Sequence, residues 1–210
     1  MADFAILLDG YRRFRAAAYP QQRARYDELA QGQAPKTMIV ACSDSRVDPT
    51  LVFDADPGSM FVVRNVANLV PPYETGGGRH GVSAALEFAV TQLEVEDVVV
   101  MGHGACGGIQ ASLTGRFDGA EAGEGGFIAA WMSAIAPARD EVRAGHADDK
   151  QLALEYAAIR LSLENLLTFP FVAERVADGR LSLHGAHFAI ADGKLRVMDP
   201  ATGEFAPAEV

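Results

Sequence analysis

The sequence is poor in cysteine and lacks any long apolar run. Only two of its 210 residues are cysteines, Cys42 and Cys106, which is too few for the disulfide framework of a small secreted protein. No run approaches the roughly 20 apolar residues of a membrane span. The N-terminal stretch MADFAILLDGYRRFR has an apolar segment too short for a signal peptide and an acid at position 3. We therefore expect a cytoplasmic protein that does not bind membranes. In such a protein a pair of cysteines more often serves a metal or catalysis, and the alternative is a single disulfide between Cys42 and Cys106.

A surplus of basic residues is also missing. Lys and Arg number 18 against 28 Asp and Glu, so the formal net charge is −10. Binding to a nucleic-acid backbone depends on an excess of Lys and Arg, so we expect no nucleic-acid partner. The chain has no internal repeat or low-complexity tract, and its length fits a single domain over residues 1–210.

The order of apolar segments predicts an α/β fold with a central, mostly parallel sheet flanked by helices. Short runs rich in β-branched residues at 37–42, 60–65 and 95–103 have the length of buried strands. Helical spacing follows at 79–93, at 126–144 and at 149–168, with Pro170 where a further helix begins. Residues 180–199 alternate and contain Asp192-Gly193, which predicts a hairpin. Residues 3–31 are predicted to be helical, with a break at Pro20, and contain little that needs a core.

The segment ACSDSRVDP, residues 41–49, places three reactive side chains at alternate positions directly after a predicted buried strand. In extended backbone, Cys42, Asp44 and Arg46 leave the chain on the same side. Parallel sheets bind ligands at the carboxyl ends of their strands. In isolation, this pattern is more often a core cysteine beside a surface ion pair.

A second cluster, MGHGACGG at residues 101–108, ends the third predicted strand. It contains His103 and Cys106 in an H-x-x-C arrangement. Together with Cys42 they form a Cys₂His set, which is typical of a catalytic zinc that leaves a fourth position for water. Asp44 would then accept a hydrogen bond from that water or hydroxide, with Arg46 holding the carboxylate in place. A redox protein that uses the two cysteines without a metal is an alternative.

Four segments together resemble the β-class carbonic anhydrase family: CSDSRVDP, RNVAN (64–68), GHGACGG and ENLLTFPFV (164–172). The resemblance implies one zinc ion per subunit on Cys42, His103 and Cys106, and a catalytic pair of Asp44 and Arg46. It implies a lyase that hydrates carbon dioxide reversibly to bicarbonate and a proton, with a zinc-bound hydroxide as the nucleophile.

The same resemblance implies substrate-binding residues and a partner subunit. Gln33 would donate to a substrate oxygen, and Phe61 and Val66 would line the carbon dioxide pocket from the partner subunit. Gly107 is a prediction from the residue type: without a side chain, it would let the chain or the substrate approach closely near the start of the following helix. Residues 1–31 would form a dimerisation arm that reaches over the partner. We therefore expect a homodimer or a higher homo-oligomer.

Some positions depart from the family pattern. Gly104 replaces a serine found in many members, and Phe88 replaces a tyrosine of the plant-like members. Ile39 stands where members regulated by bicarbonate carry a tryptophan. This predicts an open active site that bicarbonate does not switch. Arg64 is predicted to form an ion pair. The alternatives are a carbonyl sulfide or carbon disulfide hydrolase on the same scaffold, and a non-enzymatic zinc- or bicarbonate-sensing protein.

Overall fold

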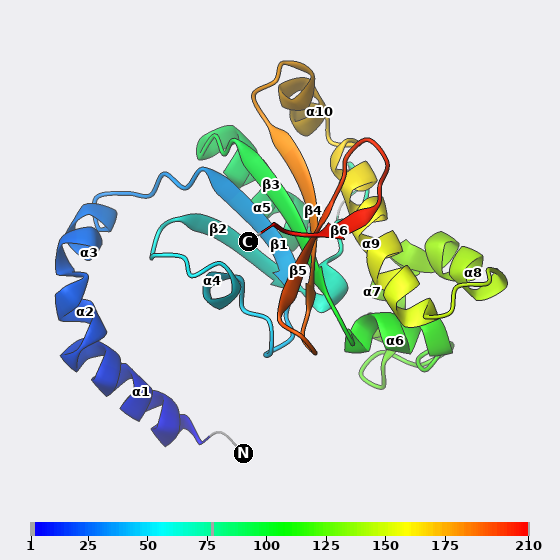
Figure 1. Cartoon of the computed structure of the whole chain (residues 1–210), viewed down its shortest axis with the longest axis horizontal. Coiled ribbons are helices and arrows are strands. Elements are labelled where there is room, and N and C mark those ends of the chain that lie inside the picture. Colours follow the sequence, from blue (N-terminus) through cyan, green and yellow to red (C-terminus); the bar gives the residue numbers. More distant parts are fainter. Residues whose placement is uncertain (1–2, 77, 210) are drawn as a thin grey trace.

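A six-stranded sheet lies at the centre of the molecule, in the order β2-β1-β3-β4-β5-β6 (Figure 1). The computed structural model describes residues 3–76 and 78–209. The strands β1 to β4 pair in parallel and the last two pair antiparallel. Their bounds are Thr37–Cys42, Met60–Asn65, Asp97–His103, Ser182–Ala189, Lys194–Met198 and Phe205–Pro207 for β1 to β6. The predicted α/β fold with a mostly parallel sheet is confirmed, and the predicted hairpin is the β4–β5 pair.

One face of the sheet carries most of the core. Alternate residues of β1, among them Met38 and Val40, point toward helices that cover this face. These helices are α5 (Gly81–Glu87), which continues as a π-helical turn over Phe88–Gln92, α9 (Lys150–Leu166) and α10 (Pro170–Ala177). The opposite face buries Ile39 and Ala41 under a thinner layer that includes Val52 of α4 (Pro49–Val52). Cys42 follows Val40 in the alternation and so turns toward the helical side.

A group of helices lies beyond the carboxyl ends of the parallel strands. It comprises α6 (Gly107–Thr114), α7 (Gly126–Met132), a 3-10 turn (Ser133–Ile135) and α8 (Ala136–Ala144). The prediction of one continuous helix over 126–144 is therefore wrong. Pro137 lies in the first turn of α8, where its missing N–H is tolerated, whereas in a helix interior it would break the backbone ladder.

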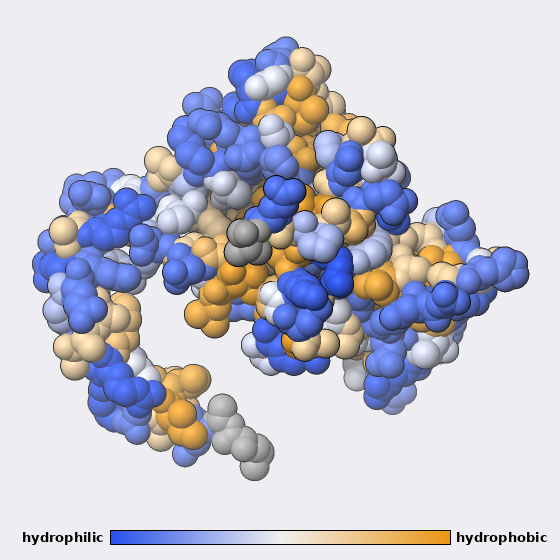
Figure 2. All heavy atoms as spheres, viewed as in Figure 1, coloured by the Kyte–Doolittle hydropathy of each residue, from blue (hydrophilic) through white to orange (hydrophobic). Residues whose placement is uncertain are grey.

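The N-terminal arm consists of three short helices that project from the body: α1 (Phe4–Ala16), α2 (Ala18–Gln21) and α3 (Arg23–Leu29) (Figure 1). Pro20 lies inside α2, and the breaks fall at Ala17 and Gln22 instead. Within the described chain, no residue of these helices is buried. Hydrophobic side chains gather toward the free end of the arm (Figure 2), where the exposed residues are Phe4, Ile6, Leu7, Leu8 and Tyr11.

The arm is attached to the body near its base. Arg25 donates a hydrogen bond from Nε to the carbonyl of Pro57 at 3.1 Å. Leu29 lies so close to Gly58 that a Cβ on that glycine would come within 2.4 Å of its side chain, and Gly58 has a φ of 83°.

Among the residues that the structure describes, no helix has both the length and the hydrophobicity to cross a bilayer.

Candidate metal centre

Cys42, His103 and Cys106 converge at the carboxyl ends of β1 and β3. One ligand atom from each lies within 4.8 Å of the others, and all three residues are buried. The two Sγ atoms are 4.0 Å apart and both thiols are free, so the alternative of a disulfide is not present. The sequence prediction that these three residues meet is therefore correct.

The imidazole of His103 is oriented for a ligand. Its Nδ1 lies 2.9 Å from the carbonyl oxygen of Gly104, to which it donates when protonated. This contact leaves the lone pair of Nε2 for a metal, and Nε2 is buried without a hydrogen-bond partner. A buried polar atom without a partner is rare. A cation at Nε2 would satisfy it, which is an independent indication that the cluster holds a metal.

The spacing and the charges of the cluster fit a divalent cation. Two sulfurs bound to a tetrahedral zinc lie about 3.8 Å apart, close to the separation observed. The hydrogen bond with Cys106 lowers the pKa of Cys42 below its usual range, against the opposing effect of burial. The same hydrogen bond, together with burial, raises the pKa of Cys106 above its usual range. Together, these shifts mean that the two sulfurs share one proton. Both sulfurs become thiolates when a cation replaces that proton.

Asp44 and Arg46 form a two-point ion pair beside the cluster. Arg46 donates from Nε to Oδ1 at 2.9 Å and from Nη2 to Oδ2 at 2.7 Å, and its backbone N–H also donates to Oδ1. These hydrogen bonds, led by the guanidinium, hold the pKa of Asp44 well below its usual range. Oδ2 of Asp44 lies 4.0 Å from Nε2 of His103. An ionised carboxylate is thus fixed at the edge of the metal site.

Arg64 ties the loop after β1 to β2. It donates to the backbone carbonyls of Cys42 at 2.9 Å and Asp44 at 2.7 Å, and it forms an ion pair with Asp48 at 2.9 Å. The expected ion pair of Arg64 is therefore present, and it fixes the backbone on both sides of Ser43. A guanidinium with three such acceptors is well satisfied.

Sequence reasoning missed a buried polar group behind Cys106. Glu155 of α9 accepts a hydrogen bond from the Cys106 N–H at 3.0 Å. Gln151 donates to the Cys106 carbonyl at 3.0 Å, and His187 of β4 lies 3.0 Å from the other oxygen of Glu155. The available signal was a glutamate between Leu152 and Ile159, on the apolar stripe of the predicted helix.

The residues expected to bind substrate lie at different distances from the cluster. Phe61 of β2 pairs with Met38 of the parallel strand β1, and Met38 lies four positions before Cys42. Phe61 is therefore about 13 Å from Cys42 along the strand direction. Gln33 is exposed before β1, and Gly107 faces open space at the start of α6. A Cβ on Gly108 would come within 2.8 Å of Val66 in the same chain. Val66 thus lies next to the start of α6 in its own chain.

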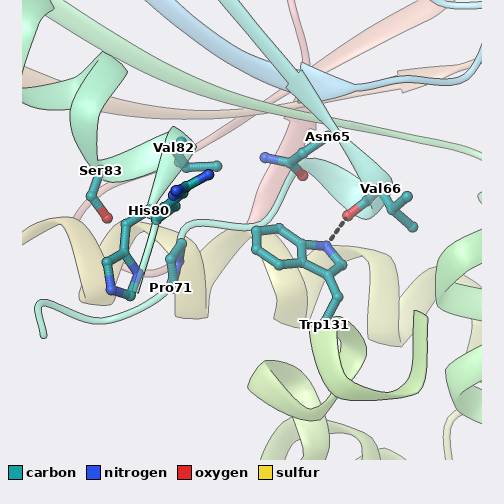
Figure 3. A pocket seen from close by; sticks show the side chains of 9 residues that line it. Asn65, Val66, Pro71, His80, Val82, Ser83 and Trp131 are labelled. Atoms are coloured by element: carbon teal, nitrogen blue, oxygen red, sulfur yellow. Dashed lines mark hydrogen bonds between the residues drawn. The ribbon is translucent and has the colours of Figure 1, made fainter. Parts of the chain in front are cut away.

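A pocket of about 310 Å³ opens beside Val66 (Figure 3). Pro71, His80 and Ser83 lie at one side of it and Trp131 at the other. The indole Nε1 of Trp131 donates to the Val66 carbonyl at 2.7 Å. This bond fixes the backbone next to Ala67, which adopts a left-handed φ of 64°, a conformation that costs a non-glycine residue about 1–2 kcal/mol.

The comparisons with known proteins agree with this geometry. A family model described as carbonic anhydrase matches residues 37–195. Beta carbonic anhydrase 5, chloroplastic, of Arabidopsis thaliana is 42% identical over 183 residues, which are 85% of this chain and 59% of that protein. The chain thus matches less than two thirds of that relative's length.

Solved structures extend the similarity to the whole fold. The β-carbonic anhydrase CcaA superimposes with a TM-score of 0.88 at 29% identity, covering 99% of this chain and 92% of that one. A tetrameric β-carbonic anhydrase of Sordaria macrospora gives a TM-score of 0.78 at 26% identity, covering 97% and 98%. With the match over residues 37–195 and the Cys₂His cluster at the strand ends, the chain belongs to the β-carbonic anhydrase family.

Proposed function

We propose that the protein is a zinc-dependent carbonic anhydrase that hydrates carbon dioxide reversibly to bicarbonate and a proton. The observation that carries the proposal is the ionised Asp44, held by Arg46 at the edge of a Cys₂His cluster. A structural zinc has four protein ligands and needs no such carboxylate. This pair therefore favours an enzyme over a non-enzymatic zinc- or bicarbonate-sensing protein.

Cys42, His103 and Cys106 would hold the cation, and their sulfur and imidazole donors favour zinc over magnesium or calcium. When bound, zinc would lower the pKa of a water molecule, so that the water releases a proton to solvent and a hydroxide nucleophile is available. The ionised Asp44 carboxylate only accepts hydrogen bonds, so it selects a nucleophile that still carries a proton and orients it.

Apolar side chains would hold carbon dioxide close to Asp44. Val66 lies beside the Gly107–Gly108 turn, and we assign it this role together with Phe61. Gln33 would donate to the substrate oxygen. Phe61 and Gln33 are far from the cluster of their own chain, so their roles require a second subunit whose Phe61 and Gln33 complete the site.

We further propose that residues 1–210 form one domain and that residues 1–31 serve as a dimerisation arm. The support is the apolar end of the arm, where 69% of Phe4 and 61% of Leu7 are exposed. Such side chains gain stability when a partner covers them. A cytoplasmic location is an expectation from the sequence; the Arabidopsis relative is chloroplastic by name.

The test combines metal analysis with a stopped-flow assay of carbon dioxide hydration. We expect one zinc per subunit and catalysis in the wild-type protein, and retained zinc with at least a hundredfold lower turnover in Asp44→Asn. Asp178→Asn is the matched control, because Asp178 pairs with Arg180 at the same sequence spacing and the same 2.7 Å. Wild-type turnover in Asp44→Asn would contradict the proposed role, and zinc without hydration in the wild-type protein would contradict the function.

A further inference from the structure

Glu155 is a charged side chain in the interior of the protein, with 3% of its surface exposed. It lies on α9, where the neighbouring buried residues are mostly apolar. A buried carboxylate is costly unless donors compensate for its lost water. The proposed reaction does not use Glu155, so its presence behind the metal centre requires an explanation.

Three donors surround the Glu155 carboxylate. Oε1 accepts from the Cys106 backbone N–H at 3.0 Å and from Gln151 Nε2 at 2.9 Å, and Oε2 lies 3.0 Å from His187 Nε2. The Gln151 amide also donates to the Cys106 carbonyl at 3.0 Å, so both of its hydrogens are used. The peptide groups on both sides of the Cys106 Cα are thus held by α9.

The His187 ring is directed by the same contact. His187 is fully buried, and its Nδ1 has no hydrogen-bond partner. A buried lone pair without a partner is tolerated better than a buried N–H without one, so Nε2 is the nitrogen that carries a proton and donates it to Glu155. The ring of Tyr156 packs edge-on against His187 at 5.0 Å and limits its rotation.

The turn between His103 and Cys106 needs support of this kind. Ala105 has a φ of 54°, in the left-handed region, which costs a non-glycine residue about 1–2 kcal/mol. Arg46 holds the Ala105 carbonyl at 3.1 Å, and the Gly104 N–H donates to Phe188. If the Cys106 N–H lost its acceptor, the turn would be free to relax and the Cys106 sulfur would move.

We propose that Glu155, supported by Gln151 and His187, is a positioning residue that fixes the Cys106 peptide and thereby holds the Cys106 sulfur in place for the metal. The inference rests on the proposed function only in requiring that the cluster binds a divalent cation. It does not depend on the reaction of carbon dioxide.

The experiment measures zinc affinity of the purified protein by competition with a chromophoric chelator, beside the thiolate-to-metal absorption of the cobalt-substituted protein. Loss of a group that supports a ligand typically weakens metal binding 10- to 100-fold, and we expect a loss of about this size in Glu155→Ala. Gln151→Ala should weaken binding less. In Glu155→Gln a side-chain oxygen still accepts from Cys106 without the charge, so its loss should also be smaller.

Glu164→Ala and Glu164→Gln are matched controls, because Glu164 is an exposed glutamate of the same helix. They should keep wild-type affinity and spectrum. Circular dichroism and thermal unfolding of the metal-free variants separate misfolding from weakened binding, and the near-isosteric Glu155→Gln keeps the test valid if Glu155→Ala does not fold.

Folded Glu155 and Gln151 variants with wild-type zinc affinity and an unchanged cobalt spectrum would overturn the proposal. A loss of metal-free stability alone would also overturn it, since that is what a merely structural role of Glu155 predicts. Wild-type protein that binds zinc without hydrating carbon dioxide would refute the proposed function and leave this inference standing.

Discussion

Replacement of Arg46 by glutamine should turn Asp44 into a metal ligand. In the structure, Oδ2 of Asp44 lies 4.0 Å from Nε2 of His103 and is directed to Arg46. Oxygen and nitrogen ligands of a tetrahedral zinc lie about 3.4 Å apart. A carboxylate displacement of less than about 1 Å is therefore enough to approach that spacing, and Arg46 is the group that opposes it.

The strength of this opposition follows from the contacts. Hydrogen bonds to charged groups are stronger than those between neutral groups, but the Arg46 side chain is 48% exposed, and solvent screening keeps the contribution of such an exposed pair small. Arg46→Gln should therefore shift the balance toward ligation by Asp44 only about 2- to 5-fold, the range expected for an exposed ion pair.

The assay is azide binding to the cobalt-substituted protein, because azide and Asp44 would compete for the fourth position. Arg46→Gln should lower azide affinity about 2- to 5-fold, and adding Asp44→Ala should restore it. Arg180→Gln, which removes the matching pair with Asp178, should have no effect. Unchanged azide affinity and an unchanged cobalt spectrum in Arg46→Gln would refute the reasoning.

Three further outcomes are expected. His103→Ala should lose most of its zinc by elemental analysis, because it removes one of three protein ligands; full occupancy would contradict the assigned metal site. Deletion of residues 1–31 should give a smaller species in analytical ultracentrifugation with reduced hydration activity, whereas an active protein of unchanged size would count against the arm. Arg46 lowers the pKa of Asp44 in the folded protein. The pair therefore stabilises the fold at pH values above about 3.9, the pKa of an aspartate in the unfolded chain. This stabilisation is lost as the pH falls through the pKa of Asp44 in the folded protein. Thermal unfolding should thus show a constant difference between wild type and Arg46→Gln from about pH 8 to pH 5 that shrinks below about pH 4; a difference that persists in acid would contradict this assignment.

The sequence was sufficient for the parts of the fold and site that depend on local pattern. Alternation predicted that Cys42, Asp44 and Arg46 leave the chain on the same side, and the strand ends identified His103 as a neighbour of Cys42. Pro137 was a visible signal for the break between α7 and α8, but the apolar spacing on either side suggested one continuous helix. Local pattern also predicted that Pro20 breaks the arm, although a proline within the first turn of α2 is tolerated.

Long-range polar contacts could not be read in the same way. Glu155 and His187 are 32 positions apart and come from a helix and a strand, and only the packing of α9 against β3 and β4 brings them behind Cys106. Nothing in the spacing of residues specifies that register. The turn at Ala67 and Asn68 was also hidden, because both adopt left-handed conformations, and alanine rarely does so, although asparagine tolerates them.

The position of the cluster across two neighbouring strands also makes it a removable crosslink. Cys42 and Cys106 are 64 residues apart in sequence, so a shared cation closes a large loop between the middle strands of the sheet. By the entropy of a loop this long, a covalent link would stabilise the fold by about 4 kcal/mol. A bound metal ion is thus a reversible crosslink. We expect its removal by a chelator to destabilise the central strands of the sheet more than the edge strands.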